Sequence, residues 1–586
     1  MSGIILLFWS FSISSSRSIE VCKGALKMTQ TPTPNMTDYE AERQHFHLDV
    51  PAEFNFAIDV IGKWASDPDK LAMLWVGQNG EERRISFAQF AERSSRAANA
   101  FVTLDMQKGD RVLVMLPRIP EWWEAVLGLM KMGAIPIPCT TLLTPKDIQF
   151  RAEIAEAVAI ITDHEGAAKF DQVRTDCPTV KYAILADEAN AGTAGHEGWI
   201  DFQQILSEAS PEYRGPKTRS DDACLVYFTS GTVGYPKMVL HTQASYPIGH
   251  TITGKYWLDL HENDLVWNLS EMGWAKAAWS NLFGPWIQGA AIFIQDARGK
   301  FDPIETLEML NKYPISTLCA PPTAYRMMVL DEPMAYMKAH PPKALRHCVG
   351  AGEPLNPEVI KVWEEATDMT IRDGYGQTET VLLCANFPPI PVKPGSMGKP
   401  SPGFEVSVID HDGSELPPNK EGDIAVRVKP NRPTWMFKEY WRNPEATNAC
   451  IRGDWYITGD RAYKDEDCYF WFVGRADDVI ISAGYRIGPF EVESALKEHP
   501  AVAESAVVAS PDEMRGEIVK AFVILAPGYT ASPELASELQ EHVKRVTAPY
   551  KYPREIEFVD SLPKTISGKI RRVELRERER ARKAEK

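Results

Sequence analysis

The chain has 586 residues and a mass of 65.7 kDa, which is long enough for more than one domain with a large buried core. Charged residues make up 25% and hydrophobic residues 44% of it, as in ordinary globular proteins, and the formal net charge of −16 argues against general affinity for nucleic acid. The nine cysteines are scattered without a C-x-x-C pair, so they form neither a disulfide framework nor a zinc motif and suit a reducing cytosol.

The N-terminal stretch carries an apolar run at residues 4–9, followed by serine-rich sequence. No apolar run approaches the roughly 18 residues of a membrane span, so we expect no stable membrane insertion. A signal peptide is the alternative for this run, but no Lys or Arg precedes it and no small-x-small cleavage site follows it. We therefore interpret residues 1–27 as an extension without a structural role, Met28 as the start, and the protein as cytoplasmic.

Strands alternate with helices through the first part of the chain. Apolar spacing predicts helices over residues 54–64, 87–104, 122–132 and 147–157, and strands over 74–76, 84–86, 111–116, 134–138 and 159–161. Gln78-Asn79-Gly80 predicts a hairpin turn between the first two strands. Elements of this size in this order predict βαβ units on a parallel sheet.

Further strands are predicted over residues 223–228, 264–267 and 290–294. A proline-rich linker at 387–400 then precedes a β-rich stretch, 404–472, which predicts a small barrel or hairpin subdomain. A second domain is expected from about Gly474, with helices over 491–497 and 534–546 and strands over 504–509 and 520–525. The mixed charges of residues 564–586 predict a solvated helical end, with an anion-binding tail as the alternative.

The stretch from Tyr227 to Lys237 combines hydroxyls, two glycines and a lysine after an apolar strand. Glycines let the backbone approach an anion closely, and successive N–H groups can form an anion-binding nest. The hydroxyls and Lys237 add donors and a positive charge, so the stretch is chemically a phosphate cradle. Pro236 directly before the lysine excludes a Walker A loop. The alternative is an exposed turn between two strands.

The order Thr-Ser-Gly-Thr-x-Gly-x-Pro-Lys at residues 229–237 resembles the signature loop of the adenylate-forming enzymes, the family of acyl-CoA synthetases, luciferases and peptide-synthetase adenylation domains. Val233 departs from the family, which usually has a second Thr or Ser there. Five more segments show the same resemblance in the same order, and together they extend it over essentially the whole chain after about residue 50. They are residues 350–354, 373–380, 456–460, 474–478 and 565–569.

The resemblance implies an α/β fold: a large N-terminal domain of two parallel-type sheets with helices plus a small β-barrel, and a smaller, mobile C-terminal α+β domain. We expect residues 28–476 to form the adenylation domain and residues 477–586 the mobile domain, with the hinge at Asp477.

The chemistry that the resemblance implies is the activation of a carboxylic acid by ATP. A carboxylate that attacks the α-phosphorus brings negative charge to negative charge, so catalysis depends on charge neutralisation and positioning. The implied catalytic residues are Lys237 on the β- and γ-phosphates, Glu379 as a ligand of Mg²⁺ together with Thr232, and Lys569 at the α-phosphate and the carboxylate.

The resemblance also implies an adenosine site, where Tyr375 stacks on adenine, Asp460 accepts the ribose hydroxyls and Arg475 is a fixed cation. The full set of implied ATP and AMP ligands is Thr229, Ser230, Gly231, Thr232, Gly234, Lys237, Gly352, Glu353, Pro354, Asp373, Gly374, Tyr375, Gly376, Gln377, Thr378, Asp460, Arg475, Arg486 and Lys569.

Residues 483–491 resemble the coenzyme A loop of the medium-chain acyl-CoA synthetases, although Ala483 replaces the more usual Ser. The implied CoA ligands are Ala483, Gly484 and Tyr485, with Arg515 and Lys544 on the CoA phosphates; solvated surface charge is the alternative for these last two. The implied acyl pocket contains Trp274, Lys276, Trp279 and Cys319, with a core position as the alternative for Trp274. A bulky Trp279 beside the acyl chain favours a short, branched or medium-length acid.

We therefore predict an ATP-dependent, AMP-forming acyl-CoA synthetase that uses Mg²⁺, ATP and CoA and passes through an acyl-adenylate. An aryl-acid CoA ligase and a stand-alone adenylation enzyme that loads a carrier protein are the alternatives. A non-enzymatic nucleotide sensor is a third, but binding alone would need neither Glu379 nor Lys569. The expected partners are small-molecule substrates and no nucleic acid; a homodimer stays open.

Overall fold

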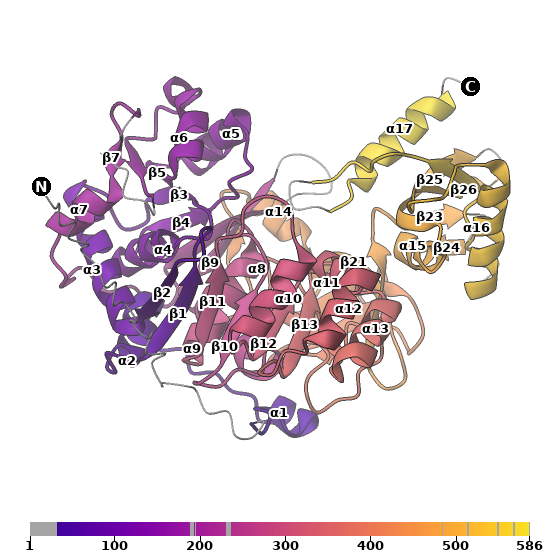
Figure 1. The fold of residues 1–586 in the computed structure, drawn as a ribbon, viewed down its shortest axis with the longest axis horizontal. Helices are drawn as coiled ribbons and strands as arrows, with labels where there is room; N and C mark the ends of the chain where they lie inside the picture. Colours follow the sequence, from indigo (N-terminus) through magenta and orange to yellow (C-terminus); the bar gives the residue numbers. More distant parts are fainter. Residues whose placement is uncertain are drawn as a thin grey trace, which may run out of the picture. The chain divides into compact units, whose positions relative to one another are not determined.

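Strands and helices alternate along the first half of the chain, as the apolar pattern predicts (Figure 1). The computed structural model describes residues 32–187, 193, 195–229, 236–482, 485–512, 515–547, 550–565 and 569–584, of which residues 485, 486 and 584 by their backbone alone. Thr33–Lys586 form one compact unit. None of the helices in the described part of the chain has the length and apolarity to cross a membrane.

A five-stranded parallel sheet forms the first layer, in the order β4-β3-β5-β6-β7. Its strands are β3 (Arg111–Met115), β4 (Ile135–Pro138), β5 (Ala159–Thr162), β6 (Tyr182–Leu185) and β7 (Ile200–Asp201). The helices that connect or follow these strands are α4 (Pro120–Met132), α5 (Pro145–Ala155), α6 (His164–Asp171) and α7 (Phe202–Glu208). The predicted βαβ units are therefore confirmed.

A nine-stranded mixed sheet forms the second layer, in the order β16-β15-β14-β13-β12-β10-β11-β1-β2. Its middle is parallel, with the predicted β1–β2 hairpin antiparallel at one edge and β15 and β16 antiparallel at the other. The strands are β1 (Leu71–Val76), β2 (Glu82–Ser86), β10 (Leu265–Asn268), β11 (Ala291–Gln295), β12 (Thr317–Ala320), β13 (His347–Ala351), β14 (Ile371–Gly376), β15 (Leu382–Ala385) and β16 (Lys399–Pro400).

One face of this nine-stranded sheet is covered by four helices (Figure 1). Apolar side chains of the helices and strands form one buried cluster, in which Trp363 and Tyr325 are fully enclosed. These helices are α10 (Pro303–Lys312), α11 (Pro322–Met328), α12 (Asp331–Ala339) and α13 (Pro357–Thr367). Elsewhere lie α1 (Tyr39–Gln44), η1 (Phe56–Val60), α2 (Ile61–Trp64), α3 (Phe87–Thr103) and η2 (Arg174–Asp176).

Helices α5, α10 and α13 begin with a capping side chain followed by proline. Thr144, Asp302 and Asn356 accept hydrogen bonds from backbone N–H groups of the first turn that would otherwise have no partner. Proline fits directly after the cap because that position needs no N–H donor. For this reason α4 and α5 begin two residues earlier than the predicted starts at 122 and 147.

Two antiparallel sheets complete the first part of the chain. The order β19-β9-β8 joins β8 (Ala223–Thr229), β9 (Lys237–Thr242) and β19 (Glu439–Tyr440). The second sheet contains β17 (Val406–Ile409), β18 (Gly422–Arg427), β20 (Ile451–Arg452), β21 (Trp455–Lys464) and β22 (Phe470–Arg475), and α14 (Pro444–Ala449) lies between β19 and β20. The ladders run β17-β18-β21-β20 with β22 on β21, so in the described residues this predicted barrel has the hydrogen bonding of an open sheet.

The C-terminal part is an α+β unit with the sheet order β24-β23-β26-β25 and β27 parallel to β26. Its elements are β23 (Ile480–Ser482), β24 (Tyr485–Ile487), α15 (Pro489–Lys497), β25 (Val502–Asp512), β26 (Gly516–Leu525), α16 (Pro533–Val546), β27 (Glu555–Phe558) and α17 (Arg572–Ala584). The four elements predicted after Gly474 are all present.

The prediction of a merely solvated C-terminal helix was wrong, because α17 packs on the sheet. Leu575 and Glu579 are both 2% exposed. The Glu579 carboxylate accepts from Ser510 Oγ at 2.8 Å and from the buried Lys520 Nζ at 2.7 Å. Although burial alone would raise it, hydrogen bonds from Arg582, Lys520 and Ser510 lower the pKa of Glu579 to about 2. The mixed charges of this segment therefore did not indicate that one of its carboxylates, Glu579, binds the sheet through Lys520 and Ser510.

Helix α4 is buried along its whole length and contains an unusual lysine. Lys131 Nζ donates to the hydroxyls of Ser94 at 2.9 Å and Ser95 at 3.0 Å and to the Ala91 carbonyl at 3.1 Å, all uncharged oxygens of α3. Burial lowers the pKa of Lys131 from 10.5 to about 8. The folded state therefore binds fewer protons than the unfolded chain between these pH values.

We expect Lys131→Met to raise the free energy of unfolding by about 2 kcal/mol at pH 7, because burial of the ammonium disfavours the folded state there. The native protein should gain stability as the pH rises from about 8 to 10.5, so the advantage of the variant should vanish over that range. Chemical denaturation of the native protein and the variant at pH 7 and pH 10 measures the gain in stability and its loss at high pH. The exposed Lys146→Met is the control; a gain independent of pH would contradict the explanation.

Candidate nucleotide and acyl-adenylate site

The two ends of the predicted phosphate cradle lie opposite each other on a β-hairpin. Thr229 at the end of β8 is the register partner of Lys237 at the start of β9. The Thr229 hydroxyl lies 3.4 Å from the Lys237 carbonyl oxygen. Residues 230–235 are outside the described residues, so the assignments of Ser230, Gly231, Thr232 and Gly234 stay predictions. The alternative interpretation, a turn, placed the stretch between two strands, and β8 and β9 flank it in this way.

Lys237 and Glu379 meet at one tyrosine. The Lys237 ammonium lies 4.7 Å from the centroid of the Tyr440 ring, a cation–π distance. The hydroxyl of the same Tyr440 donates to Glu379 Oε1 at 2.8 Å. Burial raises the pKa of Glu379, and the hydrogen bond from Tyr440 opposes that effect. A cation suited to phosphate and a carboxylate suited to a hard metal ion therefore both contact the side chain of Tyr440.

The backbone around Glu379 is held by two further contacts. The Phe437 N–H donates to the Glu379 carbonyl at 2.7 Å. His241 Nε2 lies 2.6 Å from the Thr378 carbonyl, which can only accept, so this nitrogen carries the proton. Burial lowers the pKa of His241 to about 3, which keeps the ring neutral. The segment 377–380 is thus fixed to β9 and to the segment before β19.

Asp460 is the centre of a buried polar network. It stands opposite Arg475 in the β21–β22 ladder, and Arg475 donates to Asp460 Oδ1 at 2.8 Å. Asp460 Oδ2 accepts from the Tyr375 hydroxyl at 2.6 Å and from Gln377 Nε2 at 2.8 Å. Although burial favours the neutral form, the Asp460 carboxylate raises the pKa of Arg475 further above its ordinary value. Three other predicted nucleotide ligands therefore converge on the Asp460 carboxylate.

Gly352, Glu353 and Pro354, which the family resemblance implies as the wall beside adenine, follow β13, and Asp373 lies in β14. Gly352 has a φ of +103°, a conformation open to glycine and strained for other residues, although a Cβ there would meet nothing within 4 Å. Glu353 pairs with Arg326 at 3.4 Å, and Pro354 follows it. Buried Asp373 accepts from the Gly374 N–H at 2.9 Å, and its burial raises its pKa to about 7.

Gly374 and Gly376 both allow close approaches. A Cβ at Gly376 would lie 2.5 Å from the Val381 carbonyl oxygen, and one at Gly374 would lie 2.5 Å from the indole of Trp257. The two glycines therefore let β14 pack against the following turn and against a buried tryptophan. Trp257 in turn packs on Trp279, with ring centroids 5.7 Å apart.

The predicted acyl pocket lies on short helical turns of unusual geometry. Trp279 begins the π-helical segment η5 (Trp279–Phe283), after α8 (Ala275–Ala278) and before α9 (Gly284–Ile287). Two further π-helical segments, η3 (Ala244–Ile248) and η4 (Ile252–Trp257), precede it. Such turns are rare and occur mostly at functional sites. Trp279 is partly exposed and stacks on buried His250, with centroids 6.3 Å apart.

Lys276 connects this pocket to the adenine wall. Its ammonium donates to the carbonyl of Ala351, next to Gly352, at 2.7 Å. Burial lowers the pKa of Lys276. Cys319 is fully buried at the end region of β12, and burial raises the pKa of its thiol. Trp274 is half-buried directly before α8.

The predicted C-terminal site residues are spread over several loops. Lys569 directly precedes Ile570, which forms an isolated β-bridge with Lys564. Its side chain is exposed, but the surrounding protein lowers the pKa of the ammonium, and the nearby carboxylates of Glu353 and Asp460 oppose that effect. Asp477 follows β22 in a turn, and the neighbouring Asp478 pairs with Arg576 of α17.

Of the predicted CoA ligands, Ala483 and Gly484 lie outside the described residues, and Tyr485 is described as backbone of β24 only. The same holds for Arg486, which belongs to the predicted nucleotide ligands. Arg515 has an exposed side chain, and its N–H donates to Asp512 Oδ1 at 2.9 Å. Lys544 pairs with Glu541 at 2.5 Å and lies 4.2 Å from the Tyr552 ring centroid. The CoA assignments therefore stay predictions.

Three residues that contact the site, Tyr440, His241 and Trp257, were absent from the predicted set. Each belongs to the site through long-range packing. Tyr440 lies 203 positions after Lys237 in sequence and reaches it only because β19 pairs with β9. No local motif marks such residues. The tyrosine and tryptophan content of the surrounding segments was the one available signal, and it does not distinguish a site from a core.

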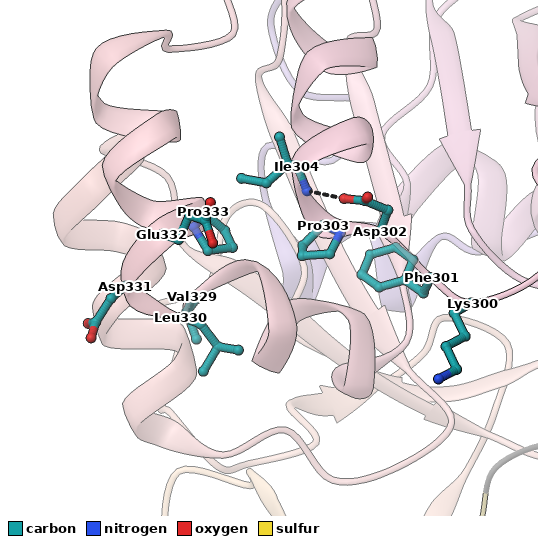
Figure 2. Close-up of a pocket in the computed structure, with 10 residues that line it drawn as sticks. All are labelled: Lys300, Phe301, Asp302, Pro303, Ile304, Val329, Leu330, Asp331, Glu332 and Pro333. Atoms are coloured by element: carbon teal, nitrogen blue, oxygen red, sulfur yellow. Dashed lines mark hydrogen bonds between the residues drawn. The ribbon is translucent and has the colours of Figure 1, made fainter. Parts of the chain in front are cut away.

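A surface hollow of about 780 Å³ lies away from these residues, between the start of α10 and the α11–α12 turn. Figure 2 shows that its labelled lining comes from residues 300–304 and 329–333 and that Asp302 caps α10 through the Ile304 N–H, at 2.9 Å. None of the residues of the predicted nucleotide or acyl site lines it. We therefore place the candidate site at the meeting of β9, β14, β19 and β21 and at the π-helical turns.

Comparison with known proteins identifies the class. The model of the AMP-binding enzyme family matches residues 62–441, and that of the AMP-binding enzyme C-terminal domain matches residues 491–569. The chain therefore belongs to the AMP-binding enzyme family, and its relatives place it among the acyl-CoA synthetases. It is 48% identical over 563 residues to acyl-coenzyme A synthetase ACSM3, mitochondrial, of Homo sapiens, with 94% of each chain covered. It is 48% identical over 553 residues to human ACSM4, mitochondrial, with 93% of each covered.

Solved structures confirm the fold class. The anthranilate CoA ligase AuaEII in complex with anthranoyl-AMP superposes with a TM-score of 0.82 at 29% identity, covering 92% of this chain and 99% of that one. An acyl-CoA synthetase of Brucella canis gives a TM-score of 0.71 at 35% identity, covering 94% and 100%. The predicted α/β class with a separate C-terminal α+β part is thus confirmed, as is the predicted family.

Proposed function

We propose that the chain activates a short- or medium-chain carboxylic acid with ATP, forms an acyl-adenylate and pyrophosphate, and transfers the acyl group to CoA. The observation that supports this most directly is the convergence of Lys237, Glu379 and the Asp460 network from separate elements. Phosphate, metal ion and ribose each need one of these groups. The AMP-binding family supplies the reaction class.

In the first half-reaction a carboxylate oxygen bonds to the α-phosphorus while the bond to the β-phosphate oxygen breaks and pyrophosphate leaves. Lys237 would hold the β- and γ-phosphates, and Lys569 would lie between the α-phosphate and the incoming carboxylate. These cations lower the repulsion between the two anions as the new bond forms. Asp460 and Arg475 would hold the ribose and fix the direction of attack.

Glu379 and Thr232 are the proposed ligands of Mg²⁺. The half-buried Glu379 carboxylate fits a hard cation shared with phosphate oxygens, because Tyr440 holds its Oε1 in place. When bound, the ion neutralises phosphate charge. In the second half-reaction the CoA sulfur attacks the acyl carbon and AMP leaves; residues 483–485 would guide the pantetheine arm, and Arg515 and Lys544 would contact CoA phosphates.

The acid is proposed from Trp279, whose partly exposed indole is backed by Trp257 and His250. The relatives named above are acyl-CoA synthetases, whereas the structural neighbours include a ligase named for benzoate. An aryl acid therefore remains the alternative substrate, and a carrier protein the alternative acceptor. CoA-dependent AMP release over acids from acetate to palmitate, with benzoate included, distinguishes these functions.

We expect the native enzyme to favour short or medium chains and Trp279→Ala to shift its preference toward longer ones. Removal of the indole would open apolar space, and each added CH₂ that fills it contributes about 0.8 kcal/mol, or roughly fourfold in kcat/KM. Trp471→Ala, which removes an indole stacked on Tyr463, is the control. An unchanged chain-length profile would show that Trp279 is a core residue.

Lys569 and the hinge support a second expectation. Lys569→Ala should slow adenylate formation by about a hundredfold, as expected for the loss of one transition-state charge contact. It should convert supplied acyl-adenylate and CoA at a near-normal rate, because CoA must enter where Lys569 stood. Asp477→Pro should do the reverse, since proline fixes φ at the pivot. Lys564→Ala, which removes a nearby lysine that pairs with Glu504, is the control. Equal slowing of both half-reactions by Lys569→Ala would contradict the proposal that they use two conformations of the C-terminal domain.

For the location, we infer mitochondria in place of the cytoplasm expected from sequence. The curated relatives are named as mitochondrial proteins. Residues 1–27 are rich in serine and contain Arg17, Lys23 and Lys27 against the single acid Glu20, a composition typical of mitochondrial transit peptides.

We expect the full chain with a C-terminal fluorescent tag to co-fractionate with mitochondria and a chain that starts at Met28 to stay in the cytosol. Both purified forms should have equal activity, because we assign residues 1–27 no structural role. Arg17→Glu in the full chain should weaken import without altering kcat. If the full chain fractionated with the cytosol, the inferred mitochondrial location would be wrong and the cytoplasmic location expected from sequence would hold.

A further inference from the structure

The nucleotide site contains two opposite charges that lie close together without neutralising each other. Lys237 begins β9, and Glu379 lies in the turn after β14. Among the described residues, no carboxylate comes within the 4.0 Å of an ion pair from the Lys237 ammonium. The residue between the two charges is Tyr440, whose ring faces the ammonium at 4.7 Å and whose hydroxyl donates to Glu379 Oε1 at 2.8 Å.

Tyr440 itself is held rigidly. It is 5% exposed. It pairs with Val239 in the β19–β9 ladder, two residues after Lys237 in β9. Its N–H donates to Thr447 Oγ1 at 3.0 Å, which ties it to α14. The same segment fixes the backbone of Glu379 through the Phe437 N–H. Hydrogen bonds to β9 and α14 therefore fix the main chain of Tyr440, and its buried side chain extends toward both charges.

We propose that Tyr440 is a positioning residue of the nucleotide site, which aims the Glu379 carboxylate with its hydroxyl and seats the Lys237 ammonium on its ring, so that the two charges stay available to metal ion and phosphate. The inference rests on the proposed function of the site. A direct Lys237–Glu379 ion pair would occupy the oxygens and the N–H donors that the substrate needs. An aromatic ring attracts a cation without accepting its proton, and a phenol donates to a carboxylate without cancelling its charge.

Two substitutions separate the two contacts. Tyr440→Phe keeps the ring and removes the hydroxyl, so the Lys237 seat stays while Glu379 loses its donor. Tyr440→Leu removes both and leaves Lys237 free to pair with Glu379. Tyr469→Phe is the matched control, because its hydroxyl donates to the Pro391 carbonyl at 2.6 Å away from the site.

The decisive measurement is the binding of Mn²⁺ to the purified enzyme in the presence of ATP. The EPR signal of free Mn²⁺ reports how much of the ion remains unbound. We expect Tyr440→Phe to weaken Mn²⁺ binding about tenfold, as for loss of a hydrogen bond to a charged group, with the KM for ATP at saturating Mg²⁺ near normal. Tyr440→Leu should weaken Mn²⁺ binding at least as much and raise the KM for ATP about tenfold. The KM for the acid should not change in either variant.

Equal Mn²⁺ binding by Tyr440→Phe and Tyr469→Phe would overturn the inference, as would a rise in the KM for the acid that matched the loss of Mn²⁺ binding. Thermal denaturation of each variant identifies a loss caused by unfolding, and Tyr440→Phe, which keeps the packed ring, carries the test if Tyr440→Leu does not fold. Glu379→Gln distinguishes failure of the proposed function from failure of the inference about Tyr440. If Glu379→Gln leaves Mn²⁺ binding and adenylation intact, the proposed function of the site fails. If Glu379→Gln abolishes Mn²⁺ binding and Tyr440→Phe does not weaken it, only the inference about Tyr440 fails.

Discussion

The hydrogen-bonded pairing of β9 with β19 is the contact on which the candidate site depends. Two residues of β19 join a strand that lies about 200 positions earlier in the chain. Through this short ladder the start of β9, with Lys237, is brought to Tyr440, and through Tyr440 to Glu379. Because backbone hydrogen bonds fix register as well as distance, the pairing determines which side chain lies between the two charges.

A second constraint is the burial of charge. Asp460 is 3% exposed, yet it has three hydrogen-bond donors, Tyr375, Gln377 and Arg475. Burial disfavours the charged form of a carboxylate, and it raises the pKa of Asp373 even though the Gly374 N–H donates to that side chain. The three donors of the network therefore hold the Asp460 side chain in one orientation. Preorganisation of this kind reduces the reorganisation needed when the nucleotide binds.

The acyl region is held together by the packing of aromatic side chains, whereas the nucleotide site is held by hydrogen bonds to charged groups. Two π-helical segments, η4 and η5, carry Trp257 and Trp279, and His250 lies between η3 and η4. A wider turn redirects side chains that a regular helix would place elsewhere, and Gly374 lets Trp257 approach β14 closely enough to support Trp279 from behind. The adenine wall and the acyl pocket are consequently connected, directly through Lys276 and the Ala351 carbonyl and indirectly through Trp257.

Local structure and reaction class could be predicted from the amino-acid order alone. Periodicity located the strands and helices of the parallel sheet, and the predicted starts of α4 and α5 were two residues late because proline in a first turn looks like a helix breaker. The ordered motifs indicated the family, since glycine, hydroxyl, carboxylate and lysine spacing is a local property of the chain. The folded chain was needed to show that the C-terminal helix is anchored through Glu579, that Asp460 is held by three donors, and that Tyr440 lies between Lys237 and Glu379. These contacts join residues from 15 to more than 200 positions apart, and no periodicity or motif shows which distant strands will share a ladder.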